Sequence, residues 1–579
     1  MNNSQIAEVF EELADLLELS GENAFRVRAY RNGAKAIRDL SEEVADILAQ
    51  SDRKLTDIDG IGDTLAEKCQ TLVETGSLPA LEKQRAKTPT TLRRVMQVPG
   101  VGPKKAATLW KELGVVDLAS LRQACEDKKI ETLKGFGAKT QTSILESLAI
   151  VEQASQRLLL HQVDALADRI RHHMLQETSI DQLEFAGSYR RGKETVGDLD
   201  ILVVSQQPSR VMDRLESLPD RTETVARGDT KMSIRVSDAF QVDLRVVPSE
   251  SWGAALQYFT GSKEHNVRVR GIAKKHHLRL NEYGFYTMDE PPQWVAGRSE
   301  EEVYERLGLP WVPPELREAR FEFDGDEPRP LPKLIVEEDL RGDLHMHTSA
   351  TDGANSLEEM VAAAQARGLE YIAITDHSKR VSMARGLDAE RTLHQWKEID
   401  AMNAQLDGSF RVWKGIECDI LESGEMDLPD DVLAQADWVM ASIHYGQKQS
   451  KQQITDRLLG AIAHPSVSAI SHPTGRLIGR REAYEVDLAA VIQAAAEADK
   501  CLELNANPHR LDLNDVHCMM AKAAGVTIVI STDAHDTSSI GAFRYGILQA
   551  RRAGLEKKDV LNTLSLSAFT KRLAKLKQS

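Results

Sequence analysis

The sequence of 579 residues has no apolar run long enough to cross a membrane, since a spanning helix needs roughly 18 or more such residues. Its first residues, MNNSQIAEVFEELADLLE, are acidic and lack the basic and apolar regions of a signal peptide. Both absences argue against membrane proteins and secreted proteins. We therefore expect a soluble, cytoplasmic protein.

Cysteine is scarce, and the five residues of this type are Cys69, Cys125, Cys418, Cys501 and Cys518. Their number is odd and no two are spaced as CxxC, which argues against a disulfide framework and against a zinc finger. We expect them to be reduced residues of the protein core.

Basic side chains are too few for strong electrostatic binding of nucleic acid, because the formal net charge is -16. Residues 301–550 contain 42 acidic and 24 basic side chains, whereas residues 51–150 contain 13 acidic and 16 basic ones. An acidic region repels phosphate backbones unless its carboxylates bind cations or face away. We expect local DNA contacts from residues 51–150.

The chain is too long for one hydrophobic core, and its length predicts about three to five folding units. Residues 1–50 alternate apolar and charged side chains at helical spacing, which predicts a small helical bundle. Three later stretches share a Gly–apolar–Gly turn before a helix: IDGIGDTLAEKC (58–69), VPGVGPKKAATLW (98–110) and LKGFGAKTQTSIL (133–145).

Such turns leave backbone N–H groups uncovered beside a helix N-terminus, where they can bind a phosphate oxygen without reading a base. The residues concerned are Gly60, Gly62, Gly100, Gly102, Gly135 and Gly137, with Lys104, Lys105 and Lys139 after the second and third turns. One copy is equally explained by a glycine-closed connection between packed helices. Three copies resemble helix-hairpin-helix motifs and favour contact with a DNA backbone.

Two carboxylates share one face of a strand in GDLDILVV, because side chains two apart on a strand point the same way. Asp198 and Asp200 repel each other unless cations lie between them. Asp243, in the apolar run AFQVDLRVV, is the natural third ligand. Three such carboxylates can bind two Mg²⁺ or Mn²⁺ ions, which activate an attacking hydroxyl and stabilise a leaving pyrophosphate.

A turn of small residues precedes this strand, in LEFAGSYRRGKETVGDLD. Gly187 and Ser188 allow a phosphate to approach the backbone, and the basic residues that follow would neutralise it. A pair of exposed aspartates on an edge strand would explain DxD alone. The coupling of DxD to GSYRRG favours a nucleotide site instead.

GSYRRGKETVGDLD, VDLRVVP and YFTGSKEHNVRVR resemble the palm and thumb of family X DNA polymerases, in the order and spacing of DNA polymerase beta, over residues 1 to about 318. The resemblance implies that Asp198, Asp200 and Asp243 are the catalytic, metal-binding carboxylates. It also implies a nucleotide site formed by Gly187, Ser188, Arg191, Gly197, Tyr258, Gly261, Lys263, Asn266 and Arg270.

The chain departs from that family pattern at several positions. Gln241 stands two residues before the third carboxylate, where an arginine is usual, and Lys263 replaces an acidic residue beside the nascent base. Lys68 aligns with the lysine that forms a Schiff base during deoxyribose-phosphate removal, so it is a candidate lyase residue. Arg26 and Thr64 replace two supporting lysines, which argues that Lys68 only contacts a phosphate.

After residue 338, apolar runs alternate with helical stretches, and the runs end in polar residues. The runs are RGDLHMHTS, YIAITDHS, RVWKGIECDI, WVMASIHYG, SAISHPTG, CLELNAN and TIVISTDAH. Seven strands with polar ends predict a parallel α/β barrel whose site lies at the carboxyl ends of the strands.

Nine potential metal ligands follow these runs: His345, His347, Asp352, His377, Glu417, His444, His472, Asp533 and His535. A single histidine at a strand end is more often a satisfied core residue. Six converging histidines with three acids would be badly desolvated without metal, and they suit two or three Zn²⁺, Mn²⁺ or Fe²⁺ ions. Phosphoester hydrolysis is the expected reaction.

This half resembles the polymerase and histidinol phosphatase (PHP) domain, and the resemblance covers residues 339 to about 570. All nine positions of that family's ligand set are filled. The resemblance also suggests Asn505, His509 and Arg510 as substrate contacts, although His509 is equally suited to a structural role.

The two resemblances together indicate a bacterial family X DNA polymerase that fills short gaps during base excision repair and trims 3′ ends. Its hydrolytic site would act as a 3′–5′ exonuclease, a 3′ phosphatase or an abasic-site endonuclease. Expected partners are gapped or nicked DNA, deoxynucleoside triphosphates and other repair proteins, without a membrane, in the bacterial cytosol near the nucleoid.

We predict a multidomain fold with α-helical, helix-hairpin-helix N-terminal domains, an α/β nucleotidyltransferase palm and thumb, and a distorted (β/α)7 barrel. The predicted boundaries are 1–85 for a lyase-like helical domain, 86–150 for the helix-hairpin-helix fingers, 151–250 for the palm, 251–318 for the thumb, 319–338 for a linker and 339–579 for the PHP domain.

Two other functions are compatible with parts of the sequence. The first is a DNA-end-binding scaffold with a structural PHP module, which the complete ligand set disfavours. The second is a nucleotidyltransferase acting on RNA or a small molecule, which would share GS and DxD but would not need three glycine hairpins or YFTGS.

Overall fold

The structure, a computed structural model, describes the chain except residues 1–2, 39, 41–43, 51–52, 59, 97, 99, 134, 154–156, 237–239, 321, 325–326 and 577–579. It divides into two compact units, Met1–Gln156 and Arg157–Ser579. Among the described residues, no helix is both long enough and apolar enough to cross a membrane.

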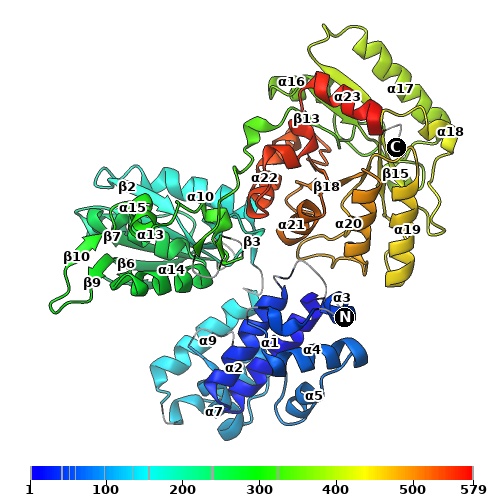
Figure 1. Cartoon of the computed structure of the whole chain (residues 1–579). Helices are drawn as coiled ribbons and strands as arrows, with labels where there is room; N and C mark the ends of the chain where they lie inside the picture. Colours follow the sequence, from blue (N-terminus) through cyan, green and yellow to red (C-terminus); the bar gives the residue numbers. More distant parts are fainter. Residues whose placement is uncertain are drawn as a thin grey trace. The chain divides into compact units, whose positions relative to one another are not determined.

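The described residues of the first unit form helices and the turns between them, as predicted. Its main helices are α1 (Asn3–Leu19), α2 (Ala24–Arg38), α3 (Val44–Ala49), α4 (Asp63–Thr75), α5 (Pro79–Arg85), α6 (Leu92–Val95), α7 (Pro103–Leu113), α8 (Leu118–Glu126) and α9 (Ala138–Gln153). They enclose one continuous apolar core that includes Phe10, Leu72 and Leu109. Figure 1 shows these helices in blue and cyan.

Each Gly–apolar–Gly turn runs directly into a helix. The first glycine of each pair has positive φ, +92° at Gly60, +83° at Gly100 and +88° at Gly135, a region that residues with a side chain rarely adopt. All six glycines are exposed. Helices α4, α7 and α9 follow the three turns, which confirms the predicted helix-hairpin-helix architecture.

The second unit begins with a five-stranded sheet in the order β2-β4-β7-β6-β5. The strands are β2 (Gln182–Phe185), β4 (Asp198–Val204), β5 (Arg221–Arg227), β6 (Lys231–Val236) and β7 (Gln241–Val247). Strands β4 and β7 are parallel, and helices α10 (Leu160–Met174) and α12 (Pro208–Glu216) pack on the sheet. A short helix, α11 (Gly187–Arg190), connects β2 to the segment before β4.

A smaller α/β region follows this sheet. It contains α13 (Trp252–Thr260), α14 (Lys263–Lys275), α15 (Glu300–Arg306) and an antiparallel sheet of β8 (Leu278–Asn281), β9 (Gly284–Thr287) and β10 (Trp294–Ala296). Phe285, Tyr304 and Val303 lie in its apolar core. The palm-like and thumb-like fold predicted from the sequence is therefore present.

Seven parallel strands form the third sheet, in sequence order. They are β13 (Gly342–Asp343), β14 (Tyr371–Ile374), β15 (Arg411–Asp419), β16 (Trp438–Ser442), β17 (Ala469–Ile470), β18 (Cys501–Asn505) and β19 (Ile528–Ser531). A parallel bridge between Met346 and Ala534 joins the segments after the first and last strands, so the sheet is nearly closed. All seven predicted strands and the barrel are confirmed.

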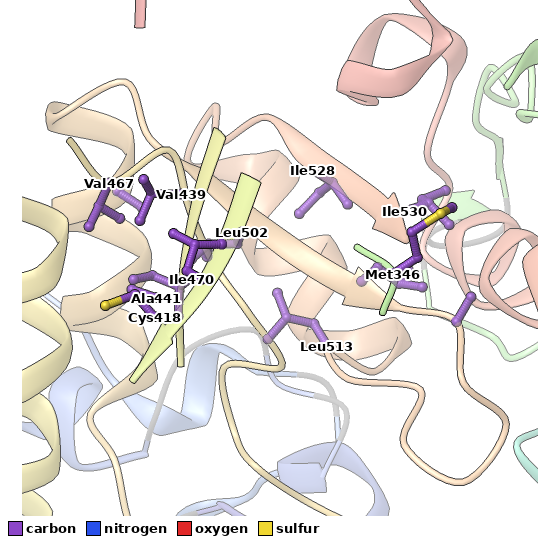
Figure 2. Packing of buried hydrophobic residues seen from close by; sticks show 14 of the residues in the cluster. Met346, Cys418, Val439, Ala441, Val467, Ile470, Leu502, Leu513, Ile528 and Ile530 are labelled. Carbon is purple, nitrogen blue, oxygen red and sulfur yellow. The ribbon is translucent and has the colours of Figure 1, made fainter. Parts of the chain in front are cut away.

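Helices between the strands and after the last strand cover the barrel. They are α16 (Leu357–Ala366), α17 (Ala389–Asn403), α18 (Asp430–Leu433), α19 (Lys451–Ala463), α20 (Leu488–Glu497), α21 (Asp515–Ala523), α22 (Phe543–Arg552) and α23 (Leu566–Leu576). Figure 2 shows apolar side chains of successive strands, including Ala441, Ile470 and Leu502, in the cluster that the strands form with these helices. This rigid core fixes the strand ends, where the histidines lie.

The five cysteines are all buried and unpaired, as expected. The segment 319–338, for which a linker is predicted, contains two short antiparallel strands, β11 (Phe323–Asp324) and β12 (Glu327–Pro328). It also contributes Glu322, whose carboxylate lies 3.0 Å from Nδ1 of the buried His265. Residues 321 and 325–326 of this segment lie outside the described residues.

Candidate polymerase and phosphoesterase sites

The three palm carboxylates lie on one face of two neighbouring strands. Strands β4 and β7 pair with Asp200 opposite Asp243 and with Asp198 opposite Gln241. Since side chains two apart on a strand point the same way, all three carboxylates face the same side. The structure therefore brings together the residues that the sequence selected.

Electrostatics at this site disfavour three bare carboxylates. Burial and the neighbouring Asp198 and Asp243 carboxylates raise the pKa of Asp200 to about 7. Burial and Asp243 likewise raise the pKa of Asp198. A divalent cation between these groups would relieve the repulsion, so the donor set fits a metal site.

Asp243 is oriented by two neighbours that the sequence did not reveal in that role. The hydroxyl of Ser233 donates to Asp243 Oδ1, and Nε2 of Gln241 donates to Asp243 Oδ2 at 2.9 Å. Gln241, which stands where the family has an arginine, therefore contacts the third carboxylate. Hydrogen bonds of this kind fix a ligand's direction before a metal binds.

The turn before β4 approaches the carboxylates closely. Gly187 has a φ of +61°, and a Cβ atom there would lie 2.5 Å from Oδ2 of Asp200. A Cβ at Gly197 would lie 2.9 Å from Nη1 of Arg157. Gly187 therefore requires glycine because of its positive φ, whereas at Gly197 the flexible end of Arg157 would have to shift to admit a side chain. Ser188 lies in the first turn of α11 beside Gly187.

Arg191 lies at the end of this turn, with its side chain 12% exposed. Its Nε donates to Oε1 of Glu318 at 3.0 Å, and its Nη1 donates to the carbonyl of Thr260. Its positive charge lowers the pKa values of Asp198 and Asp200, against the larger effect of burial. Arg191 thus lies within electrostatic reach of the carboxylates.

The remaining predicted nucleotide contacts lie together on α13 and α14, which meet at Gly261. Asn266 donates from Nδ2 to the carbonyl of Tyr258 at 2.7 Å, and Arg270 donates from Nε to the carbonyl of Asn266 at 3.2 Å. Lys263 is exposed at the first position of α14. A Cβ at Gly261 would lie 3.1 Å from Arg191 Nη1.

All nine predicted PHP ligands converge at the barrel end. Asp352, His377, Glu417, His444, His472, Asp533 and His535 line one cavity of about 480 Å³. His345 and His347 are fully buried beside it, with His347 Nε2 3.2 Å from Asp533 Oδ1 and His345 Nε2 3.5 Å from Glu417 Oε2.

The ligand atoms form three groups, each with all atoms within 4.8 Å of one another: His347, Asp352, His377 and His535; His345, His347 and Asp533; and His377, Glu417 and His444. His472 lies outside these groups, but its Nε2 is 3.0 Å from Oε1 of Glu417. Three overlapping groups could each hold a metal ion, and the predicted number of two or three ions stays a prediction.

Several of these buried atoms have no hydrogen-bond partner within the described part of the chain, among them His345 Nε2, both ring nitrogens of His347 and Glu417 Oε2. Unsatisfied buried polar atoms are costly and rare. Burial and the neighbouring His535 and His377 imidazoles lower the pKa of His347 to about 3, so its ring is neutral and can donate a lone pair. The site therefore fits nitrogen- and oxygen-bound transition metals.

Two of the ligands have unusual backbone conformations. His472 has a φ of +27° and Asp533 has a φ of +53°. Residues with a side chain adopt such angles at a cost of about 1–3 kcal/mol, usually at functional sites. The strand ends thus place these two side chains at the expense of local strain.

Sequence reasoning missed the acids that support the histidines. Glu503 is fully buried, and its carboxylate accepts from His345 Nδ1 at 2.8 Å and from the backbone N–H of His472 at 2.6 Å. Asp419 lies 3.1 Å from Nδ1 of His444. Both acids lie within strand-end runs, CLELNAN and GIECDI, and a charged residue in a buried strand was the available signal.

Two of the three suggested substrate contacts lie at the cavity. Arg510 lines it, with Nε 3.3 Å from Asp533 Oδ2, and Asn505 donates from Nδ2 to the same oxygen at 3.1 Å. His509 instead packs its ring against His161 of the palm region, with ring centroids 4.9 Å apart. The structural interpretation of His509 is thus the better supported one.

In the first unit, Lys104 and Lys139 are exposed at the starts of α7 and α9, and Lys105 lies over the ring of Phe136 at 5.5 Å. The second and third glycine turns are therefore neighbours. Lys68 lies half-buried on α4, and its part in lyase chemistry stays a prediction.

Family models match five segments of the chain. They describe a helix-hairpin-helix domain (residues 1–78), a SAM-like helix-hairpin-helix tandem (92–149), a DNA polymerase beta palm (157–237), a DNA polymerase beta thumb (255–318) and a PHP domain (343–507).

Curated relatives match either the whole chain or part of it. The DNA polymerase/3′-5′ exonuclease PolX of Bacillus subtilis (strain 168) is 41% identical over 583 aligned positions, which cover 99% of this chain and 100% of that protein. A "Probable phosphatase" of Caldicellulosiruptor bescii is 32% identical over 211 positions, 35% of this chain and 82% of that protein. A whole-length match at this identity shows the family: the chain belongs to the bacterial family X DNA polymerases with a PHP domain.

Proposed function

We propose that this protein is a DNA-directed DNA polymerase that fills short gaps during DNA repair, and that its PHP site trims 3′ ends by hydrolysis. The observation that carries the first activity is the register that sets Asp200 opposite Asp243. The convergence of nine metal-ligand side chains at the end of the barrel supports the second.

At the palm, Asp198, Asp200 and Asp243 would bind Mg²⁺ or Mn²⁺, which lower the pKa of the attacking 3′-hydroxyl and neutralise the leaving pyrophosphate. Ser233 and Gln241 keep Asp243 in position. Ser188 and Arg191 would bind the triphosphate, because a guanidinium pairs well with phosphate oxygens. Their arrangement beside the carboxylates supports in-line transfer to a primer end.

The thumb residues would surround the sugar and base of the incoming nucleotide. Tyr258 and Asn266 are joined by a hydrogen bond, so their positions are fixed together. Lys263 is exposed at the start of α14. It stands where the family pattern has an acidic residue, and its positive charge would attract the triphosphate. Gly261, between α13 and α14, has no side chain and so leaves space for the guanidinium of Arg191.

At the PHP site, the nine ligands would bind two or three Mn²⁺, Zn²⁺ or Fe²⁺ ions, which activate water and neutralise the attacked phosphate. Glu503 and Asp419 orient His345 and His444. Arg510, at the cavity wall, would pair with a phosphate of the DNA end.

We infer that the hydrolytic activity is a 3′–5′ exonuclease, which the name of the Bacillus subtilis relative supports. Two relatives named as probable phosphatases match 38% and 35% of this chain. Their names favour removal of a 3′-phosphate as a second reaction of the PHP site. Cleavage at abasic sites uses the same chemistry and is the third candidate.

One labelled gapped DNA substrate, incubated with Mg²⁺ or Mn²⁺ and with or without nucleotides, tests the proposal. We expect Asp198→Ala to abolish nucleotide addition and to retain hydrolysis, and His345→Ala to do the reverse, because each removes one metal ligand of one site. A scaffold would show neither activity in the wild type. Loss of both activities in either variant would contradict two independent sites.

A further inference from the structure

Helix α22 (Phe543–Arg552) of the C-terminal barrel makes contacts on two of its sides. Phe543, Ile547 and Ala550 belong to the barrel core, and Gly546 lets the helix approach Ala506 and Ile530 closely. The spacing of these residues defines one side of the helix. The opposite side carries Arg544, Leu548 and Arg552, spaced four residues apart.

That second face contacts the palm at the loop that carries the proposed phosphate contacts, residues 187–194, called here the phosphate loop. Leu548 packs on the palm core, and a Cβ atom at Gly192 would lie 3.1 Å from it. Gln549 Nε2 donates to the carbonyl of Gly192 at 2.9 Å.

Charged contacts extend this interface along the loop. Arg544 Nη2 lies 2.9 Å from Asp164 Oδ1, which also accepts from the hydroxyl of Tyr189 at 2.7 Å. Arg476, from another barrel segment, pairs with Glu194 at 2.6 Å. The barrel therefore contacts Gly192 and Glu194 of the loop directly and Tyr189 through Asp164.

Arg552 makes the most specific of these contacts. Its Nη1 donates to the carbonyl of Arg191 at 2.8 Å and to Oε1 of Glu318 at 3.0 Å. Glu318 Oε1 is the same oxygen that accepts from Arg191 Nε at 3.0 Å. The side chain of Arg552 is 1% exposed, so these contacts are shielded from water and solvent ions.

The shared oxygen sets the availability of Arg191. A triphosphate must compete with Glu318 for the guanidinium of Arg191, and the charge of Arg552 offsets part of the attraction of that carboxylate. The hydrogen bond from Arg552 to the Arg191 carbonyl also fixes the backbone from which the guanidinium extends. Both effects favour binding of a nucleotide.

We propose that Arg552, on the barrel helix α22, is a positioning residue for nucleotide binding in the palm, acting through Glu318 and the backbone of Arg191. This inference rests on the proposed role of Arg191 in binding the triphosphate. It makes the PHP domain a structural part of the polymerase site, in addition to its own hydrolytic site.

The test compares Arg552→Met with Arg551→Met in the full-length chain. Arg551 is the neighbouring residue, and its Nε pairs with Glu315 at 2.7 Å, so its replacement removes the same charge from α22 without touching the phosphate loop. Besides Glu318, Arg552 pairs with Asp515, at 2.7 Å. Arg552→Met leaves each of these two carboxylates another cation, since Arg191 lies 3.0 Å from Glu318 and Arg320 lies 2.9 Å from Asp515. We therefore expect both variants to fold, which thermal unfolding checks.

Steady-state gap filling gives KM for the nucleotide and kcat, and calorimetry on gapped DNA with a dideoxy-terminated primer gives the Kd of the nucleotide without chemistry. For Arg552→Met we expect KM and Kd to rise about tenfold, with kcat changed less than twofold and hydrolysis of 3′ ends unchanged. Arg552→Lys retains the positive charge but not the planar guanidinium group, and we expect KM and Kd to rise about threefold. Arg551→Met should match the wild type.

A KM and Kd within twofold of the wild type for Arg552→Met would overturn the proposal. Equal rises of KM and Kd in Arg552→Met and Arg551→Met would also overturn it. Such a result would mean that loss of any charged contact of α22 weakens nucleotide binding. If Arg552→Met does not fold, Arg552→Lys decides by the same criteria. A failure of the proposed polymerase function is distinguishable, because it would appear as absent nucleotide addition in the wild type.

Discussion

At the scale of single residues, the chemistry depends on side chains whose charges are unfavourable alone. Burial and the neighbouring carboxylates raise the pKa values of Asp200 and Asp198. At the barrel end, six histidines and three acids are held close together. Both clusters become favourable when cations bind. The neighbours that orient them, Gln241 in the palm and Glu503 in the barrel, therefore matter as much as the ligands.

Binding of Mg²⁺ at the palm should weaken below about pH 7. The pKa of Asp200 is raised to about 7, so the carboxyl is ionised above that pH and must lose a proton to bind metal below it. We expect the Mg²⁺ concentration that gives half-maximal nucleotide addition to be constant above pH 7 and to rise up to about tenfold per pH unit below it.

The rate at saturating Mg²⁺ serves as the control, because deprotonation of the primer hydroxyl changes that rate and not the Mg²⁺ concentration at half saturation. The test covers about pH 5.5 to about pH 7.5, a range that includes the raised pKa of Asp200. A half-saturating Mg²⁺ concentration that is constant over this range would contradict the prediction.

Glu503→Gln should impair hydrolysis selectively. The carboxylate fixes the ring of His345 and the backbone of His472, and loss of such support typically costs about 10–100-fold in activity or metal affinity. We expect that decrease in release of 3′ nucleotides from a labelled strand, with unchanged nucleotide addition. Glu497→Gln on the exposed surface of α20 is the matched control.

At the scale of elements, short turns set the sites. The glycine turns before α4, α7 and α9 and the phosphate loop before β4 all use glycines with positive φ, at Gly60, Gly100, Gly135 and Gly187. Their positions were visible in the sequence because glycine pairs and GS motifs are local signals. The seven barrel strands were visible for the same reason, as apolar runs that end in polar residues.

The helix-hairpin-helix turns should contribute separable phosphate contacts. Lys104 and Lys139 are exposed at the starts of α7 and α9. Replacing each by alanine should lower the slope of log K against log salt concentration by about one per lysine, with little change between DNA sequences. Fluorescence anisotropy on gapped DNA at several salt concentrations measures the slope. Lys111→Ala, at the far end of α7, is the control.

An unchanged slope in the Lys104→Ala/Lys139→Ala double variant would contradict this prediction and would favour the interpretation of the turns as connections between packed helices.

At the scale of the whole molecule, the chain is two compact units with different stabilising interactions. The unit Met1–Gln156 has an apolar helical core and no cluster of metal ligands among its described residues. The unit Arg157–Ser579 contains both the palm carboxylates and the histidine-rich groups of the barrel. Metal binding is therefore linked to the folding of the second unit.

Adding Mn²⁺ to metal-free protein should raise the Tm of the second unit. A ligand at about 100 times its Kd stabilises the native state by about 2.7 kcal/mol. We expect scanning calorimetry to show a shifted transition for residues 157–579 and an unshifted one for residues 1–156. His345→Ala should reduce the shift, and an equal shift in that variant would indicate that Mn²⁺ binds elsewhere.

The sequence by itself determined the fold class, the strands of the barrel, the glycine turns and the candidate metal ligands, because each depends on residue types at fixed local spacing. Only the tertiary structure decided which distant residues support them. Glu503 reaches His345 across 158 positions of sequence, and Arg552 reaches Arg191 across 361. Such contacts arise from packing of elements far apart in the chain, and the spacing of residues along one strand or helix does not encode them.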